Sequence, residues 1–531
     1  MKQDIEGNRE IFMDLVQSNI HMDMVKCRAV SQITMEDDIN LKEDCPDISR
    51  IIMQEGTVSI SECRASADHV TVRGTLDVDI LYLTEEEDET LESTSGKLPF
   101  EEVVFAEGIQ AGDTVDVICK MEDLSVGMIN SRKMSVRSIL TFTLQADALY
   151  DEIAATDLRC EENEKIEFRK KQMQIAKLAV CKRDVCRIHQ EATLPNGYPN
   201  FYRIVYKSIR LNNPEFKPKD NEIHVSGELA VFLLYDSADE EDNIRFYETQ
   251  LPFHAVVDCQ GSTDTMIPDI RWSITGQDFE IRPDFDGEER SFAIDMTMQL
   301  CMKLYEESQL NILSDVYGIR NEVTTEGKQG NFRRILMRND GRCRVDETVS
   351  MNEAVPILQM LHMQGDVSLE DYTILEDGVQ VEGIMTVKSL FVTQDDKMPY
   401  MADSQSFPFT YTLEAKGLPK DCICNLEVSL CQLSGIVTDA KQLEVKAVLT
   451  VSGLFMEEFA QELITELHVQ PLDKKIMENQ PGIVIYFVQP GDSLYLIGKK
   501  YYMPVDKIRQ LNELQSDTLV PGQQLILMRD M

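Results

Sequence analysis

Reactive side chains at suggestive spacings are few in this sequence. Cys186 and His189 lie three positions apart, a spacing at which a thiol and an activating base could meet. A second cysteine, Cys343, stands at a corresponding place later in the chain, but Asp346 replaces the histidine there. We therefore interpret both cysteines as parts of a hydrophobic core and predict no catalytic residue.

Two further stretches suggest ion or phosphate binding. Residues 284–287, Asp-Phe-Asp-Gly, begin like a calcium loop but lack the later ligands, so we expect a hairpin turn. Residues 327–330, Gly-Lys-Gln-Gly, lack the spacing of a phosphate-binding loop, and a turn is expected there too. The 13 cysteines include no Cys-x-x-Cys pair, which argues against a zinc site and a disulfide framework. We predict buried, reduced thiols, no metal site and no cofactor.

A threefold internal repeat organises most of the chain. Each copy has an alternating apolar pair before a glycine, and these glycines, Gly74, Gly227 and Gly383, are spaced 153 and 156 residues apart. Other residues keep fixed offsets from each glycine. A proline precedes it by 27 or 28 residues, an aromatic residue follows after eight, and a proline in an apolar triplet follows after 25: Pro46, Pro199 and Pro356; Tyr82, Tyr235 and Phe391; Pro99, Pro252 and Pro408.

Each repeat is predicted to be mostly antiparallel β-structure. In the first copy, apolar residues alternate from Val70 to Tyr82 and again from Met134 to Leu144, which is the period of a half-buried strand. Short strands separated by turns favour a sandwich or a barrel. The period is too long for a solenoid, so we expect separate beads, each with its own core. The predicted domains are three β repeats at 1–160, 161–325 and 326–470.

The charge is distributed unevenly along the 531 residues. The formal net charge is −41, but residues 482–531 hold five basic and five acidic side chains, so the excess lies entirely before them. Acidic clusters recur after the aromatic residue of each repeat, and we interpret them as solvated hairpin tips: Glu85 to Glu89, Asp239 to Asp242 and Asp395–Asp396. An acidic surface opposes non-specific binding to nucleic acid or anionic lipid.

The chain also lacks the patterns of membrane insertion and export. No run approaches the roughly 18 consecutive apolar residues of a transmembrane helix. The first residues mix acids with apolar side chains and show no basic region followed by an apolar one, so we expect no secretory signal. These features predict a soluble, acidic, multidomain protein that stays inside the cell that makes it.

A different small module is predicted at residues 483–531, after a linker at 471–482. Residues 483–488 form a short β-prone run, and the turn that follows contains Asp492 and Ser493, either of which can cap a helix. A second helix begins near Pro504, and residues 523–528 form a closing strand. The predicted order is β-α-α-β, a small α+β domain.

This segment resembles a LysM domain, a small glycan-binding module. The resemblance rests on a leading Tyr-Phe-Val-Gln-Pro-Gly-Asp-Ser-Leu run at 486–494 and on residues spaced through the rest of the module: Ile497, Tyr501, Leu511, Asn512, Leu519 to Gln523, and Leu525. Gly498 departs from the family pattern, which usually has alanine at this helical position. A glycine there should cost the helix about 1 kcal/mol.

The LysM resemblance implies a shallow groove for chains of N-acetylglucosamine. By this resemblance, the two sides of the groove correspond to these residues: Gly491, Asp492, Ser493 and Leu494 on one side, and Asn512, Asp517, Thr518 and Leu519 on the other. A purely structural interpretation stays open beside it, in which Asp492 and Ser493 only cap a helix and Asn512 only ends one. Capping and binding are compatible.

Three such β repeats followed by one LysM domain resemble the SPOCS family of spore-coat-associated proteins. The resemblance implies a morphogenetic protein of endospore-forming, clostridial bacteria, located in the mother-cell cytoplasm at the surface of the developing spore. It implies a non-enzymatic scaffold that helps attach the coat. It also implies that the LysM domain binds a sporulation ATPase of the coat basement layer, glycan such as peptidoglycan, or both.

Two alternative functions are weighed against the scaffold. One is a peptidoglycan-binding protein of the cell wall. The other is a LysM-targeted cell-wall hydrolase, which is disfavoured because the seven histidines are dispersed, no His-Glu-x-x-His motif occurs, and repeats account for the rest of the chain. Three acidic β domains would give a scaffold several docking faces, and multivalency would make modest contacts persistent.

Overall fold

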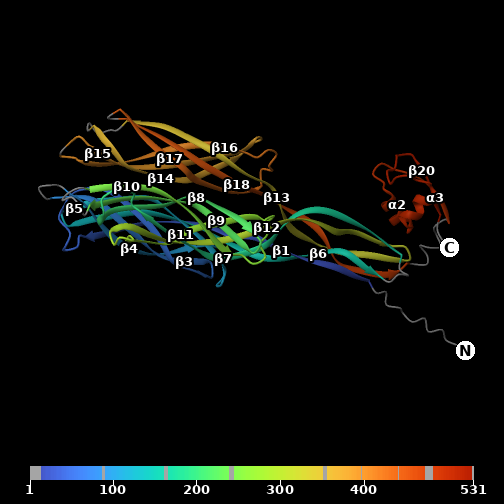
Figure 1. Ribbon diagram of the computed structural model, residues 1–531. Helices are drawn as coiled ribbons and strands as arrows, with labels where there is room; N and C mark the ends of the chain where they lie inside the picture. Colours follow the sequence, from blue (N-terminus) through green and yellow to red (C-terminus); the bar gives the residue numbers. More distant parts are fainter. Residues whose placement is uncertain are drawn as a thin grey trace.

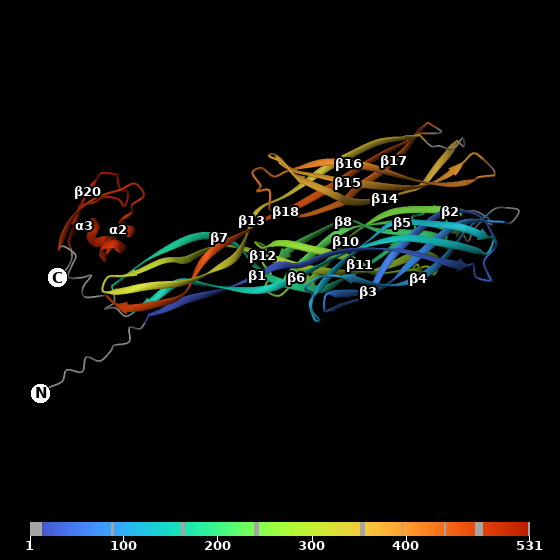
Figure 2. The ribbon, with the colours of Figure 1, turned by 180° about the vertical axis from the view of Figure 1, so that it is seen from behind.

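The computed structural model describes residues 13–85, 90–160, 165–237, 244–350, 356–395, 397–439, 442–472 and 482–528. It shows an elongated molecule, with three β domains at one end, a narrower stalk in the middle and a small domain with two helices at the other end (Figures 1 and 2). Neither helix in the described residues has the length and apolar character needed to cross a membrane. The predicted acidic tips at 86–89, 239–242 and 396, and most of the predicted linker, lie outside the described residues.

The three repeats share one topology of six antiparallel strands. The first comprises β1 (Met13–Asn40), β2 (Ile48–Ser66), β3 (His69–Thr84), β4 (Leu91–Phe105), β5 (Val115–Asn130) and β6 (Lys133–Cys160). The second comprises β7 (Ile166–Thr193), β8 (Phe201–Lys219), β9 (Glu222–Ser237), β10 (Ile244–Asp258), β11 (Ile267–Pro283) and β12 (Glu289–Gly318). The third comprises β13 (Asn321–Ser350), β14 (Ile357–Ile374), β15 (Gly378–Thr393), β16 (Tyr400–Glu414), β17 (Ile423–Asp439) and β18 (Gln442–Pro471).

Each repeat is a sandwich of two three-stranded sheets, which confirms the predicted fold class. In the first repeat, the sheets have strand orders β1-β6-β5 and β2-β3-β4, and the other two repeats repeat this order. Alternate residues of β3, such as Val70 and Val72, face Leu140 and Phe142 of β6 in the core. The period-2 apolar pattern therefore fills the space between two sheets, as a sandwich requires.

The repeated sequence motif has a packing explanation. A Cβ atom on Gly74 would lie 2.5 Å from the ring of Phe100, so the glycine makes room for the phenylalanine of the apolar triplet. Gly383 and Phe409 repeat this contact at the same 2.5 Å. The hydroxyl of the repeat tyrosine donates a hydrogen bond of 3.2 Å to the carbonyl of the repeat proline, in the pairs Tyr82 with Pro46 and Tyr235 with Pro199.

The repeats are not separate beads, which corrects the prediction. Each has its own core, but Leu81, Leu234 and Leu390, which occupy equivalent positions, meet in a further core that all three repeats share. A polar triplet of equivalent residues also meets: Ser208 donates to Gln364 at 2.8 Å, and Gln364 donates to Glu55 at 3.3 Å. The sheet β2-β3-β4 and its counterparts β8-β9-β10 and β14-β15-β16 therefore pack against one another by their outer faces, around a pseudo-threefold axis.

The stalk is built from the far ends of the longest strands. Beyond a bulge in each repeat, one long strand pair continues as a two-stranded arm. We call these arm 1 (13–25 with 147–160), arm 2 (166–178 with 305–318) and arm 3 (321–335 with 456–471). They pack on one another through residues from every arm: Ile20, Met22, Ala154, Ile175, Ile312, Phe332 and Leu463, then Ala155, Leu313 and Ile464 nearer the tip.

Residues 327–330 lie in this stalk, which corrects the prediction of a turn there. They belong to β13, and the register with β18 shifts between Glu326 and Gly327. A Cβ atom on Gly330 would lie 2.5 Å from a methyl carbon of Leu463, so the glycine admits a core side chain of the stalk. The glycines serve packing and a bulge, not chain reversal.

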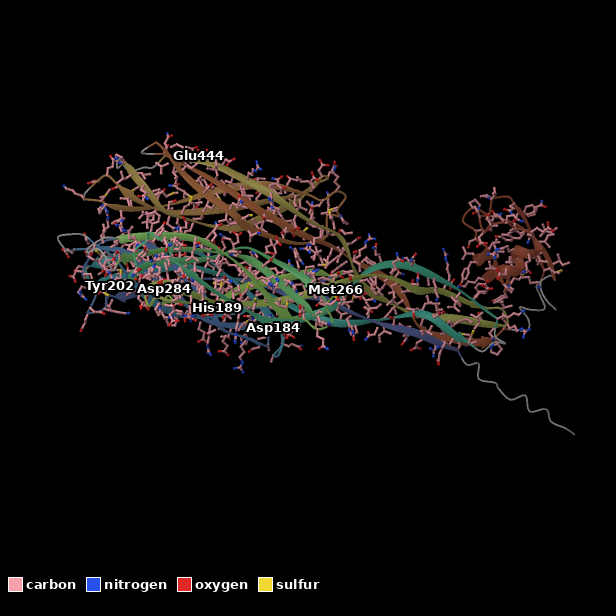
Figure 3. All side chains as sticks on the ribbon, in the orientation of Figure 1. Asp184, His189, Tyr202, Met266, Asp284 and Glu444 are labelled. Atoms are coloured by element: carbon pink, nitrogen blue, oxygen red, sulfur yellow. The ribbon has the colours of Figure 1, made fainter. Side chains whose placement is uncertain are left out.

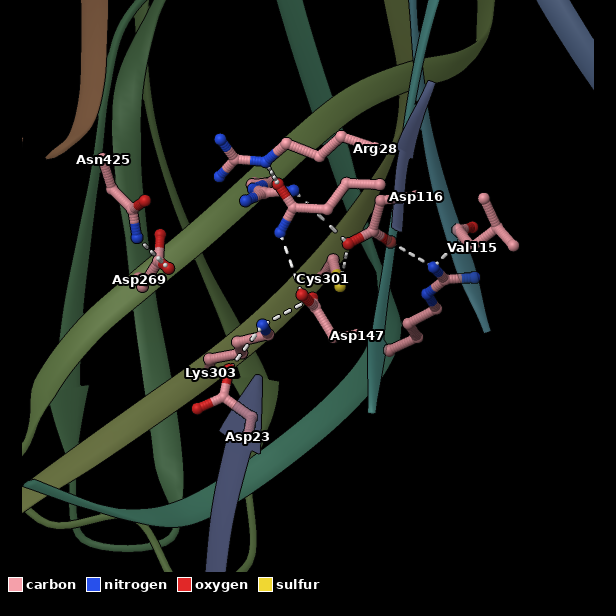
Figure 4. Close-up of polar contacts among 12 residues, drawn as sticks. Asp23, Arg28, Val115, Asp116, Asp147, Asp269, Cys301, Lys303 and Asn425 are labelled. Atoms are coloured by element: carbon pink, nitrogen blue, oxygen red, sulfur yellow. Dashed lines mark hydrogen bonds and ion pairs between the residues drawn. The ribbon is translucent and has the colours of Figure 1, made fainter. Parts of the chain in front are cut away.

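A cluster of charged side chains is buried where the three repeats meet the stalk (Figure 4). Lys303 of the second repeat contacts Asp23 at 2.8 Å and Asp147 at 2.5 Å, both from the first repeat. Arg333 of the third repeat contacts Asp23 at 3.2 Å. The side chains of Lys303 and Asp23 are only 9% and 2% exposed. Because each charge needs its partner in a buried setting, the cluster fixes the three repeats relative to one another.

The small domain at the end of the chain follows the predicted β-α-α-β order. Its elements are β19 (Ile483–Phe487), α2 (Leu494–Tyr501), α3 (Val505–Leu511) and β20 (Gln524–Met528), and the two strands pair antiparallel. The helices cover one face of this sheet and form a small core of their own: Val488, Leu494, Ile497, Met503, Ile508, Leu525 and Leu527.

Candidate functional site

The first side of the predicted groove is the turn between β19 and α2. Gly491 adopts φ +91°, a left-handed conformation that favours glycine. The Asp492 carboxylate accepts hydrogen bonds of 2.7 Å from the backbone N–H of Gln489 and from the Tyr486 hydroxyl. These two donors lower the pKa of Asp492 below its ordinary value, the backbone N–H most strongly. The turn is thus closed by a carboxylate that remains charged at neutral pH.

Ser493 and Leu494 support the turn from the helix side. Ser493 is the N-cap of α2, and its Oγ accepts a hydrogen bond of 3.2 Å from the backbone N–H of Leu496. Leu494 is 2% exposed and points into the core of the small domain. On this side, Gly491, Asp492 and Ser493 stay accessible to a ligand, whereas Leu494 holds the helix in place.

The second side of the predicted groove contains a polar clamp. The Asn512 side-chain N–H donates 2.9 Å hydrogen bonds to the carbonyls of Ile508 and Ile526, and its Oδ1 accepts one of 2.6 Å from the N–H of Ile526. Asn512 therefore ties the end of α3 to the edge of β20, as a neighbouring strand would. Because the amide makes all three bonds within the domain, Asn512 has a structural role on this side of the predicted groove.

Asp517, Thr518 and Leu519 form the loop that enters β20. Asp517 and Thr518 are exposed, and Arg509 holds the Asp517 carboxylate through hydrogen bonds of 3.0 and 2.7 Å. Leu519 is half-buried and packs on the same small core as Leu494. The two loops of the predicted groove therefore pack on the same core, and the second loop exposes the polar side chains of Asp517 and Thr518.

Sequence reasoning missed an apolar face on the same domain. The helices cover one face of the β19–β20 sheet. On the opposite face, large apolar side chains are between 40% and 63% exposed: Ile483, Ile485, Phe487, Ile526 and Met528. Contiguous exposed apolar side chains of this kind are typical of interaction sites. The unbroken apolar run at 483–488 carried the signal, because a strand that is apolar at both alternate sets of positions has no solvent face.

The residues singled out for catalysis and calcium binding belong to the second β repeat and not to the small domain; His189 and Asp284 are labelled in Figure 3. Cys186 is buried, which raises the pKa of its thiol, whereas His189 is exposed and pairs with Asp295 at 2.7 Å. The Asp284 carboxylate accepts backbone N–H bonds from Asp286 and Glu288, which confirms the predicted hairpin turn. Neither place combines the groups that its suggested chemistry needs.

The cysteines differ partly from the prediction. All 13 are free thiols, as expected, and Cys186, Cys259, Cys343 and Cys422 are buried. However, Cys63, Cys160 and Cys181 are exposed, so the expectation of buried thiols is wrong for these three.

One group of possible metal-binding side chains lies on arm 3. Glu326, Glu466 and His468 are all exposed, and their potential ligand atoms lie within 4.8 Å of one another. His468 is 2.9 Å from Glu326. The spacing along the chain gives no sign of the group, because Glu326 lies on β13 and the other two lie on β18. The arrangement is that of a surface ion pair.

Comparisons with known proteins match both kinds of domain. The family described as "SipL, SPOCS domain" matches residues 47–129, 202–282 and 356–436, and the LysM domain family matches residues 486–527. Each SPOCS match covers the second to fifth strands of a repeat and leaves out most of the long strands that form the arms.

Two curated proteins of Bacillus subtilis (strain 168) match short stretches. YdhD, which is named as a sporulation-specific glycosylase, is 49% identical over 43 residues, which cover 8% of this chain and 10% of that protein. The uncharacterized protein YkzQ is 44% identical over 49 residues, which cover 9% of this chain and 65% of that protein. No solved structure matches the chain. With three SPOCS domains followed by one LysM domain, the chain belongs to the SPOCS-repeat proteins with a C-terminal LysM domain.

Proposed function

We propose that this protein is a non-enzymatic scaffold that tethers the spore coat to the surface of the developing spore. It would act from the mother-cell side, with the LysM domain binding a coat-basement protein, glycan, or both. The observation that carries the proposal is the separation of two kinds of binding module at the two ends of one elongated molecule (Figure 1). A tether needs two ends that bind different partners.

Two surfaces of the LysM domain support this role. The accessible polar groups of Gly491, Asp492, Ser493, Asp517 and Thr518 suit the hydroxyl and acetamido groups of N-acetylglucosamine chains. The apolar sheet face, which ends with Met528, suits a protein surface better than a sugar. A coat-basement ATPase of the kind expected from the family resemblance is the protein partner that we propose.

The SPOCS end supports multivalent assembly. Three similar domains are held around one axis, and the negative excess of the chain lies on this part. Equivalent faces of three domains can engage several partner copies at once, which raises the lifetime of attachment without a strong single contact.

The hydrolase alternative gains little from the comparisons. SPOCS and LysM domains are binding modules, and YdhD, which carries the name of a glycosylase, matches over only 10% of its own length. Its activity therefore does not transfer to this chain. Incubation with purified cell wall would test the alternative: release of soluble fragments would establish an enzyme.

Removal of residues 482–531 tests the tether. We expect the truncated protein to lose its place at the spore surface and the coat to detach, while the three-repeat body stays folded because its cores lie outside the deleted segment. Circular dichroism of the purified body is the folding control. Normal localisation with normal coat attachment would contradict the proposal.

The second candidate, a peptidoglycan-binding protein of the cell wall, is favoured by the LysM match alone. Two parallel pull-downs separate it from the tether, one on insoluble peptidoglycan and one on isolated coat-basement protein. Binding to peptidoglycan without binding to coat protein would favour the cell-wall function.

A further inference from the structure

We infer that the LysM domain is docked on arm 2 of the stalk through Tyr317, and that Gly498 is present in α2 to admit this tyrosine. The LysM domain then presents its ligand surfaces in a fixed orientation relative to the three SPOCS repeats. This inference concerns how the domain is held and does not depend on which ligand it binds.

Tyr317 fills a close-fitting site on the LysM domain. It is 3% exposed, and its hydroxyl donates a hydrogen bond of 2.9 Å to the carbonyl of Met503, in the turn between α2 and α3. Its ring meets Tyr495 edge-on, with 5.1 Å between centroids and 73° between planes. A buried tyrosine with its hydroxyl satisfied across a domain boundary is the type of anchor that dominates interfaces.

Gly498 is the position that makes this fit possible. A Cβ atom there would lie 2.5 Å from the Tyr317 hydroxyl oxygen and 2.7 Å from the Met503 carbonyl oxygen, the two atoms that hydrogen-bond to each other. An alanine would therefore clash with the anchor and with the carbonyl of the LysM turn that accepts its hydrogen bond. The departure from the family's alanine, unfavourable for an isolated helix, is explained by the contact that it allows.

Polar contacts surround the tyrosine. Lys499, in the last turn of α2, contacts both carboxylate oxygens of Asp315 at 2.7 and 2.9 Å. The carboxylate of Glu167, on the other strand of arm 2, lies beside the start of α3, near Val505 and Asp506. Burial raises the pKa of Glu167, and so does the nearby Asp506. Both strands of arm 2 thus contact the LysM domain, each through an acid.

The contact is specific to arm 2. The arms can be aligned by a hydroxyl that bonds a carbonyl across the strand pair in each: Thr156 to Val16, Ser314 to Arg169 and Thr465 to Glu326, at 3.0 to 3.2 Å. The residue three positions after the hydroxyl-bearing residue is Arg159 on arm 1, Tyr317 on arm 2 and His468 on arm 3. Two of the three arms therefore lack the aromatic anchor and place a basic side chain there.

Docking through this face leaves the ligand surfaces free. The contact uses Tyr495, Gly498 and Lys499 of α2, the following turn and the start of α3. The turn at 491–493 and the apolar sheet face lie elsewhere on the domain and remain exposed or half-buried. A partner would therefore bind the LysM domain without displacing it from the stalk.

Hydrogen exchange of the full-length protein, followed by mass spectrometry, tests the docking. Tyr317→Ala and Gly498→Ala change opposite sides of the contact, and we expect each to speed exchange at least tenfold both in 313–318 and in 499–505. The matched control is His468→Ala at the equivalent position of arm 3, which should leave both segments unchanged. Unchanged exchange in the segment across the contact from each substitution would overturn the inference.

Faster exchange in β20 or in the stalk core would reveal that Tyr317→Ala or Gly498→Ala disturbs folding. In that case, a charge swap across the contact still tests the docking. Lys499→Glu and Asp315→Lys should each speed exchange across the contact, because each places like charges face to face. The double variant should restore slow exchange. If the single variants change nothing, or the double variant fails to restore protection, the LysM domain is not docked through this face.

Discussion

The three-repeat body and the LysM domain reach stability in different ways. The body shares an apolar core and a buried charge cluster among three repeats, so that each repeat depends on the other two. The LysM domain has one core of seven buried side chains and relies on polar clamps at Asp492, Ser493 and Asn512. We therefore expect the body to unfold as one unit, whereas a substitution in the LysM domain should destabilise that domain alone.

Loss of the buried cation should have the largest effect. Lys303→Met leaves the carboxylates of Asp23 and Asp147 buried without their shared partner, and breaking a buried pair in this way costs about 3–5 kcal/mol. We expect the urea midpoint of the body to fall, with exchange rising in all three repeats and not in the LysM core.

An exposed lysine provides the control for this variant. Lys217 pairs with Glu215 at 2.6 Å, but its side chain is 67% exposed, so Lys217→Met should change stability by at most about 0.5 kcal/mol. Equal effects of the two substitutions would show that burial of the cluster contributes nothing.

The shared apolar core should give the next largest effect. Leu81 is fully buried against the other two repeats, and Leu81→Ala should cost about 3 kcal/mol. Hydrogen exchange should quicken in the second and third repeats as well as in the first. Leu358→Ala, at a site 63% exposed, is the control. Faster exchange confined to the first repeat would restore the interpretation of separate beads.

The sequence predicted the sandwich of each repeat but not how the repeats pack. The alternating residues of β3 indicated one buried face, and the fixed offsets indicated three copies. Residues 80–83, however, are apolar without interruption, and Leu81 and Leu83 face the shared core. An unbroken apolar run is typical of a strand covered on both faces. What covers the second face depends on contacts between residues more than 150 positions apart, which periodicity within one repeat does not contain.

The sequence likewise predicted some features of the candidate site and not others. Capping by Ser493 followed from its place before an apolar helix, and the structure confirms it. The clamp made by Asn512 depends on β20, 14 residues further on, and the role of Gly498 depends on Tyr317, which lies in another domain. A local pattern predicts local hydrogen bonds, whereas side chains that act across domains are recognised only in three dimensions.

Asn512 offers a local test within the LysM domain. Asn512→Ala removes three hydrogen bonds and leaves the N–H and carbonyl of Ile526 without these partners, which should cost the domain about 2 kcal/mol. Methyl resonances of Ile497 and Ile508 would report the lower melting temperature, while the body remains unchanged. Gln510→Ala, at a neighbouring exposed position, should have little effect. No loss of LysM stability would contradict the clamp and favour a direct ligand role for Asn512.

The pH response of Asp492 should be the smallest effect and the most local. Its folded-state pKa lies below the ordinary value of 3.8, because the N–H of Gln489 and the Tyr486 hydroxyl bind the charged carboxylate. A lowered pKa contributes stability that is fully present above 3.8 and is lost as the pH falls through the folded-state value. The LysM melting temperature should therefore fall on acidification below about pH 4, and Asp492→Asn should flatten this part of the curve. A variant with the same acid dependence as the parent would show that the turn does not rely on the charge, and that Asp492 is free to serve a ligand instead.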